Sequence, residues 1–172
     1  MGNGPVLLGG RVVLRPVRRG DVDTLHRHWN RRAVRRYLWD DRPVARETVE
    51  EIVARSEQDF RRAGYGLWIV EHNGAPVGCC GLRLDDHRDL VELLYSVDAE
   101  CWGQGLATEA ARAVIAFAFE TLGLDQLVAS VDEPNIASIR VLEKAGMRVL
   151  DRQSGDDPAC SYTITRADFS RQ

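Results

Sequence analysis

The chain has 172 residues, of which 44% are hydrophobic, and it carries 26 acidic and 23 basic side chains. This length fits one globular domain over residues 1–172 and is too short for two domains of ordinary size. The longest uninterrupted apolar run, residues 113–119, is far shorter than the roughly 20 residues of a bilayer-spanning helix. With no signal-peptide pattern at the start, we expect a cytoplasmic protein that does not enter a membrane.

The net charge of −3 is unevenly distributed. Residues 1–62 hold 14 basic and 9 acidic side chains, and the remaining residues hold 9 basic and 17 acidic ones. Such a balance does not favour nucleic-acid binding. The arginine cluster at residues 31–36 could bind an acidic partner or form a solvated helix face. The acidic residues that follow it favour the solvated helix face.

Cysteine and histidine spacing gives no sign of a disulfide framework or a metal site. The four cysteines include no C-x-x-C pair, which favours a reduced protein with inert thiols. His26 and His28 lie on a predicted helix, where residues two apart point about 200° away from each other. We therefore expect no bound metal.

The first half of the chain predicts a strand, two amphipathic helices and an antiparallel meander. The strand covers residues 11–16, and the first helix follows Asp21, a candidate N-cap, with Val22, Leu25 and Trp29 on one side. The second helix covers residues 47–63 and ends at Gly64. The meander strands are expected at residues 67–71, 76–84 and 91–97, with Asn73-Gly74 as a type I′ turn.

The second half predicts a parallel crossover followed by a hairpin. A helix after residue 107 ends at Gly123 and leads to a nearly all-apolar strand at residues 127–131, which suits a sheet covered on both faces. A shorter helix after Pro134-Asn135 ends at Gly146, and residues 147–151 and 160–165 form the closing hairpin around residues 154–158. We expect a mixed α/β layer of about seven strands with helices on both faces.

Between a strand and a long helix lies the segment Trp102-Gly103-Gln104-Gly105-Leu106-Ala107-Thr108. Two glycines and a helix N-terminus favour a phosphate or pyrophosphate ligand, although a tight turn alone also needs glycine. A Walker P-loop is excluded, because Lys144 is the chain's one lysine and no matching glycine loop precedes it. A dinucleotide fingerprint is weakened but left open, since Thr108 replaces its third glycine while Asp132 mimics the ribose-binding acid.

Several segments in order resemble the GNAT superfamily of acetyl-CoA-dependent N-acetyltransferases, and most closely its RimJ/RimL-like branch of ribosomal-protein N-terminal acetyltransferases. They are residues 14–16, 78–82 and 91–97, the glycine segment with Thr108-Glu109-Ala110, and residues 135–147. The resemblance implies a mostly antiparallel GNAT sheet with a parallel, splayed central pair at residues 91–97 and 127–131. It also implies an acyltransferase that transfers groups other than aminoacyl groups.

In this family the pattern [QR]-x-x-G-x-[GA] binds the coenzyme A pyrophosphate, and Trp102 stands here in place of Gln or Arg. Pantetheine is expected to pair with exposed backbone in the splay. The resemblance thus implies acetyl-CoA as co-substrate, without a metal. The implied cofactor-binding residues are Tyr95, Ser96, Val97, Trp102, Gly103, Gln104, Gly105, Leu106, Ala107, Thr108, Asn135 and Ser138.

Acetyl transfer to an amine needs a base and a donor to the leaving sulfur. Glu92, a carboxylate within an apolar strand, matches the base proposed in the RimL-like branch, with an outward-facing strand residue as the equal alternative. Ser138 matches the sulfur donor of that branch, because Leu142 replaces the tyrosine that many GNAT enzymes use. Asn135 is expected to cap its helix as well as to contact pantetheine.

The acceptor pocket is expected near the first two helices, where aromatic side chains are as compatible with the core as with a pocket: Trp29, Tyr37, Trp39, Tyr65 and Trp68. A peptide N-terminal α-amine is the favoured acceptor, since deprotonating lysine at pH 7 costs about 3 kcal/mol more. Two alternatives stay open, a small-molecule amine acetyltransferase and a noncatalytic acyl-CoA-binding module. The expected assembly is a monomer or a homodimer.

Overall fold

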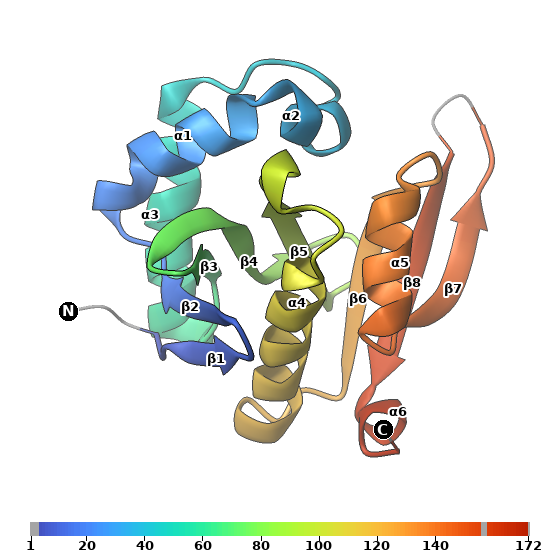
Figure 1. Ribbon diagram of the computed structural model, residues 1–172. Helices are drawn as coiled ribbons and strands as arrows, with labels where there is room; N and C mark the ends of the chain where they lie inside the picture. The colour runs from blue at the N-terminus through green and yellow to red at the C-terminus, as the bar shows by residue number, and fades with distance from the viewer. Residues whose placement is uncertain (1–3, 156–157, 172) are drawn as a thin grey trace.

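A computed structural model of the chain describes residues 4–155 and 158–171 (Figure 1). Within these residues one eight-stranded sheet has the order β1-β2-β3-β4-β5-β6-β8-β7. Neighbouring strands are antiparallel except β5 and β6, which are parallel. The strands are β1 Leu7–Gly9, β2 Val12–Pro16, β3 Leu67–His72, β4 Ala75–Asp85, β5 Leu90–Val97, β6 Gln126–Asp132, β7 Arg148–Gln153 and β8 Ala159–Thr165.

The predicted mixed sheet with one parallel pair is confirmed, with eight strands where about seven were expected. The additional strand is β1, whose three residues pair with β2. A segment this short carries no measurable alternation of apolar and polar residues, so it gave no period-2 signal.

Helices cover both faces of the sheet, as Figure 1 shows with α4 in front of the strands and α3 behind them. The helices are α1 Val22–Asn30, α2 Arg32–Leu38, α3 Arg46–Ala63, α4 Leu106–Ala116, α5 Ile136–Lys144 and α6 Arg166–Phe169. A π-helical turn, Phe117–Thr121, extends α4. No helix among the described residues is long and apolar enough to cross a membrane.

The central strands bury both of their faces, because each face packs against a different helical layer. On β3, Trp68 and Val70 belong to the cluster under α4, whereas Leu67 and Ile69 belong to the cluster under α1 and α3. Successive side chains of a strand point to opposite faces. The near-continuous apolar runs in the sequence are therefore explained by a two-sided core.

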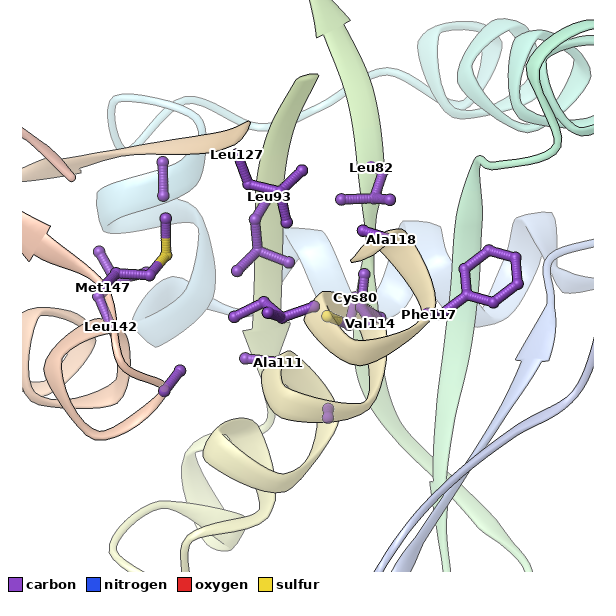
Figure 2. Close-up of a cluster of buried hydrophobic side chains, with 14 of the residues drawn as sticks. Cys80, Leu82, Leu93, Ala111, Val114, Phe117, Ala118, Leu127, Leu142 and Met147 are labelled. Atoms are coloured by element: carbon purple, nitrogen blue, oxygen red, sulfur yellow. The ribbon is translucent and has the colours of Figure 1, made fainter. Parts of the chain in front are cut away.

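Helix α4 fits closely against the sheet because its inward stripe contains small residues. Ala110 and Ala111 have no measurable exposure, and Val114 and Ala118 continue the stripe. Figure 2 shows Ala111, Val114 and Ala118 beside Cys80, Leu82 and Leu93 of the sheet. Leu142 of α5 belongs to the same buried cluster. This packing fixes the N-terminus of α4 above the end of β5.

Most predicted turns and helix ends are confirmed. Asn73 and Gly74 have φ angles of 52° and 76°, as the type I′ turn requires, and Gly64 ends α3 with a φ of 79°. The predicted Asp21 cap is wrong in its chemistry. Asp21 stands at the N-cap position of α1, but its carboxylate accepts bonds from the Arg15 guanidinium and the Arg18 amide.

The closing hairpin is confirmed as β7 and β8, which pair antiparallel. Its predicted turn at residues 154–158 includes residues 156 and 157, which lie outside the described residues. The favoured interpretation of the arginine cluster as a solvated helix face agrees with α2, on which Arg32 and Arg36 are exposed. The bounds of this helix were not predicted, because Val34 is its one buried residue and gives no apolar period.

Candidate active site

The parallel pair at the centre of the sheet separates after two residues of register. Pairing joins Val91 to Leu127 and Glu92 to Val128, and beyond these residues β5 and β6 have no common register. Each strand continues on its outer side, β5 along β4 to Val97 and β6 along β8 to Asp132. Backbone groups on the inner edges beyond Glu92 therefore need partners that the sheet does not supply.

The N-terminus of α4 lies at the open end of this separation. Gly103 and Gly105 have φ angles of 74° and 82°, a region that favours glycine. No side chain caps α4 at Gly105, so the amides of its first turn and the positive end of the helix dipole are available to an anion. No heavy atom lies within 4 Å of a Cβ built at Gly103, so the glycine is needed for its φ angle and the space beside it is open.

Arg11 holds the glycine loop in place, a role that the sequence did not reveal. Its Nη2 donates to the Gln104 carbonyl at 2.5 Å and to Glu109 Oε1 at 2.6 Å. The Arg11 backbone amide also donates to Glu109 Oε2 at 2.7 Å. Because Glu109 is in the first turn of α4, these bonds tie the loop and the helix to the start of β2.

A cavity of about 820 Å³ connects the loop with the separation between the strands. This volume is within the range of small-molecule sites. The cavity brings together both predicted catalytic residues and all predicted cofactor-binding residues except Gln104, whose side-chain amide donates to the Glu100 carbonyl at 3.1 Å. Its wall also includes α2 residues Ala33, Val34, Tyr37 and Leu38.

Glu92 is buried, with 7% exposure, and lines the cavity. The alternative of an outward-facing strand residue is therefore wrong. Its Oε2 accepts a hydrogen bond from Arg83 Nε at 2.8 Å and forms an ion pair with Arg83 Nη2 at 2.7 Å, and the Arg83 side chain is 65% exposed. The pair places one neutralised carboxylate at the point where β5 and β6 separate.

Ser138 lies in the first turn of α5, on the opposite side of the separation from β5. Its amide donates to Asn135 Oδ1 at 3.1 Å, which confirms the predicted cap. The Tyr95 hydroxyl crosses from β5 to lie 2.9 Å from the Ser138 carbonyl oxygen and 2.7 Å from Ser138 Oγ. Burial raises the pKa of Tyr95 far above its usual value, so this phenol stays protonated.

Trp102 replaces the Gln or Arg of the family pattern, and its side chain forms a hydrogen bond with the backbone of β5. Its indole Nε1 donates to the Val97 carbonyl at 2.8 Å, and the residue is 49% exposed. The indole thus anchors the glycine loop to the last residue of β5.

A buried hydrogen-bonded cluster adjoins the cavity at Ser96. His28 Nδ1 lies 2.6 Å from Asp98 Oδ1, and His28 Nε2 lies 2.8 Å from Ser96 Oγ. The predictions placed Ser96 only as a pantetheine contact and missed His28 and Asp98. His28 is separated from both by about 70 residues of chain, so no local pattern signals the cluster.

Of the aromatic residues considered for the acceptor pocket, Tyr37 lines the cavity. Trp29, Tyr65 and Trp68 are instead buried in the core, and Trp39 packs against Trp29 with ring centroids 5.5 Å apart. Each of these side chains has much more apolar than polar surface, so burial in the core is more favourable than exposure in a pocket. Among the described residues, no group of three or more histidine, cysteine or acidic side chains is placed to hold a metal ion.

Comparison with known proteins gives a matching family model and similar relatives. A family model described as an acetyltransferase (GNAT) domain matches residues 11–148. The chain is 30% identical to spermidine N(1)-acetyltransferase of Escherichia coli K12 over 139 residues, which cover 80% of this chain and 73% of that protein.

Solved structures share the fold over nearly the whole chain. RimL, a ribosomal L7/L12 alpha-N-protein acetyltransferase solved with coenzyme A, superposes with a TM-score of 0.79 at 15% identity, covering 94% of this chain and 98% of that one. AAC(6′)-Ib, solved with paromomycin and acetyl-CoA, superposes with a TM-score of 0.78 at 21% identity, covering 94% and 97%. At these identities the similarity concerns the fold.

Proposed function

The chain belongs to the acetyltransferase (GNAT) domain family, and from that membership we propose that it transfers acetyl from acetyl-CoA directly to the N-terminal α-amine of a peptide or protein. The family uses acetyl-CoA and an amine acceptor. The finer assignments, to the RimJ/RimL-like branch and to an α-amine acceptor, are the proposal.

One observation carries the proposal, namely that a single cavity joins the α4 N-terminus to Glu92 through the gap between β5 and β6. The coenzyme pyrophosphate fits at the α4 N-terminus, where the amides of residues 106–108 begin the helix. Pantetheine fits along the unpaired edge of β5, since its amides supply the partners that this edge lacks. The thioester then reaches the interior of the cavity, between Glu92 and Ser138.

Within that cavity the residues supply the groups that acetyl transfer requires. Glu92 accepts a proton from the incoming ammonium, through water, and the neutral amine attacks the thioester carbonyl. A backbone N–H of β5 donates to the developing oxyanion. Ser138 donates to the sulfur as the C–S bond breaks, because Leu142 occupies the place of the family's usual tyrosine and is 1% exposed.

The charges of the cavity wall favour a peptide over a polycationic amine. Its acidic side chains are Glu92, which Arg83 neutralises, and Asp132, while its basic ones are Arg83, Arg140 and Lys144. A polyamine requires several uncompensated carboxylates, whereas an α-amine requires one proton acceptor and titrates near pH ~8. The similarity to spermidine N(1)-acetyltransferase supports a small-molecule amine as the second candidate.

Two measurements test the proposal. Calorimetry with acetyl-CoA should detect binding at micromolar concentrations, and no binding at high micromolar concentration would refute the cofactor site. An acceptor screen by free-thiol release should show turnover with peptides that have a free N-terminus and little with spermidine. The reverse preference would support the small-amine alternative, and coenzyme binding without thiol release from any acceptor would indicate a noncatalytic module.

A further inference from the structure

The cluster of His28, Asp98 and Ser96 has the hydrogen-bond directions of a proton relay that ends in the cavity. His28 is 5% exposed and bonded at both ring nitrogens. A neutral imidazole has one N–H, and a carboxylate can only accept. The Nδ1–H therefore donates to Asp98, which leaves Nε2 to accept the hydroxyl proton of Ser96.

The surroundings of His28 keep it neutral yet ready to take a proton. Burial lowers the pKa of His28, and the Asp98 carboxylate opposes this shift while Arg31 adds to it. Arg31 Nη1 lies 3.3 Å from Asp98 Oδ2 and 2.9 Å from Glu100 Oε2. On the sheet side, His28 contacts Ser96 of β5, and Ser96 in turn contacts Cys79 of β4. Helix α3 packs against α1 through the apolar cluster that includes Val49 and Val53.

Ser96 retains capacity for a further donor. Its Oγ lies 3.4 Å from Cys79 Sγ, a weak partner, and a hydroxyl oxygen accepts up to two hydrogen bonds. Ser96 is half-buried and lines the cavity. By the alternation of a strand it shares a face with Glu92, four residues and about 13 Å away. The Glu92 carboxylate can therefore exchange a proton with a group beside Ser96 only through water molecules.

An amine that arrives as an ammonium ion loses two protons before it becomes an amide. The first must leave before attack, and the second leaves the nitrogen of the tetrahedral intermediate. A single carboxylate that has taken the first proton is no longer a base for the second. The site therefore needs a second proton acceptor on the acceptor side of the cavity.

We propose that Ser96 is a catalytic residue that takes this second proton, with His28 and Asp98 as positioning residues that act through it. The proposal rests on the proposed acetyl transfer. In this step the nitrogen of the tetrahedral intermediate gives its proton to Ser96 Oγ while the Ser96 hydroxyl proton moves to His28 Nε2. The C–S bond breaks with its electron pair on sulfur, and the leaving thiolate accepts a hydrogen bond from the Ser138 hydroxyl and takes its proton from water. Asp98 stabilises the imidazolium until it releases its proton to solvent.

The test measures kcat against pH with one peptide acceptor for the wild type and for Ser96→Ala, His28→Gln and Asp98→Asn. Each variant should lower kcat about 10- to 100-fold, within the range of acid–base contributions, and leave the KM for acetyl-CoA unchanged. In the wild type kcat should rise with pH below about 6.5 as His28 becomes neutral, and this rise should disappear in His28→Gln. The double variant Ser96→Ala/His28→Gln should be no slower than either single one, because the two residues act in one chain.

Ser56→Ala is the matched control. Ser56 is 2% exposed, and its Oγ accepts a hydrogen bond from the Leu67 amide at 2.7 Å. The described residues that line the cavity do not include it. It should lose stability but keep the wild-type kcat and pH profile. If His28→Gln fails to fold, Ser96→Ala, which removes one buried hydroxyl, still decides the question.

Three results separate the possibilities. If the wild type turns over and Ser96→Ala has the same kcat and pH profile, the relay is overturned and the proposed function stands. No thiol release by the wild type with any acceptor would overturn the proposed function, and with it the proton step. Mass spectrometry after incubation with acetyl-CoA should find Ser96 unmodified, and an acetyl group on Ser96 would overturn the relay in favour of a covalent serine intermediate.

Discussion

The Tyr95 hydroxyl lies 2.7 Å from Ser138 Oγ and joins β5 to α5 across the gap in the sheet. This contact gives Tyr95 a side-chain role in addition to the backbone role expected from the sequence. The phenol has one proton, which it donates to the Ser138 carbonyl oxygen at 2.9 Å, because a carbonyl can only accept. The phenol thus holds the first turn of α5, and with it the Ser138 hydroxyl, beside the gap.

Replacing Tyr95 with phenylalanine should lower kcat about tenfold, which corresponds to the loss of one hydrogen bond of about 1.4 kcal/mol. Steady-state thiol release measures this effect. The double variant Tyr95→Phe/Ser138→Ala should be no slower than Ser138→Ala, since Tyr95 acts through Ser138. Tyr162→Phe is the control, because Tyr162 is 2% exposed, interacts with Glu143 and is not among the described residues that line the cavity. An equal loss in this control would contradict the specific role of Tyr95.

Substituting alanine for Gly105 should weaken acetyl-CoA binding about tenfold or more. A side chain at positive φ costs roughly 1–2 kcal/mol, and the added methyl group would lie 3.5 Å from Arg11 Nη2, which holds the glycine loop through the Gln104 carbonyl. Gly123→Ala carries the same backbone cost, with a φ of 69° and no contact closer than 3.7 Å, at the far end of α4. Calorimetry should show normal affinity in Gly123→Ala. Equal affinity in the two variants would mean that the coenzyme binds elsewhere.

Changing Glu92 to glutamine should reduce kcat about 100-fold, because the amide keeps the shape of the side chain but accepts no proton. Glu71→Gln tests whether a lost ion pair alone has this effect. Glu71 accepts from Arg15 Nε at 2.8 Å, as Glu92 accepts from Arg83, yet it is on β3 and not among the described residues that line the cavity. The measurement is kcat with saturating substrates, and equal losses in both variants would refute Glu92 as the base.

The stability of the protein should fall in acid partly through Asp21. Burial by itself raises the pKa of this carboxyl, but hydrogen bonds from Arg15 and the Arg18 amide outweigh it, so the pKa is lowered. A lowered pKa means that the stabilisation is fully present above the unfolded value of about 3.9 and is lost as pH falls through the folded value. Asp21→Asn should therefore lower Tm at pH 7, and the difference from the wild type should shrink below pH ~4.

Thermal melts across pH check this expectation. Asp23→Asn serves as the control, because Asp23 also pairs with an arginine, Arg46, but its side chain is 71% exposed. Exposed pairs contribute little, so this variant should change Tm only slightly. A drop in Asp23→Asn as large as in Asp21→Asn would contradict the role of partial burial.

The strands and helices with clear periodicity were predictable because each buries one defined stripe or face. The strand–helix–strand order predicted that residues 91–97 and 127–131 are parallel, and the family resemblance implied that they separate; both are confirmed. Gly103 and Gly105, which were expected to free the loop backbone, have positive φ angles. The three-residue strand β1 was not predictable, since so short a segment is specified by pairing and not by pattern.

The candidate site was predictable where it depends on consecutive residues and not where it depends on tertiary contact. The loop at residues 102–108 is a local feature, so its place in the cavity follows from the sequence. The partner of Glu92, Arg83, is set by the register of β4 against β5. His28 reaches Ser96 only because α1 packs across β4, which no spacing within α1 indicates.

The central claim, acetyl transfer to a peptide α-amine, is tested most directly by locating the transferred group. The substrate is a peptide with a free N-terminus and one internal lysine, incubated with acetyl-CoA and the enzyme and sequenced by tandem mass spectrometry. We expect one acetyl group on the α-amine and none on the lysine, with no product from the same peptide blocked at its N-terminus. Acetylation confined to lysine, or no peptide product while spermidine is acetylated, would contradict the account.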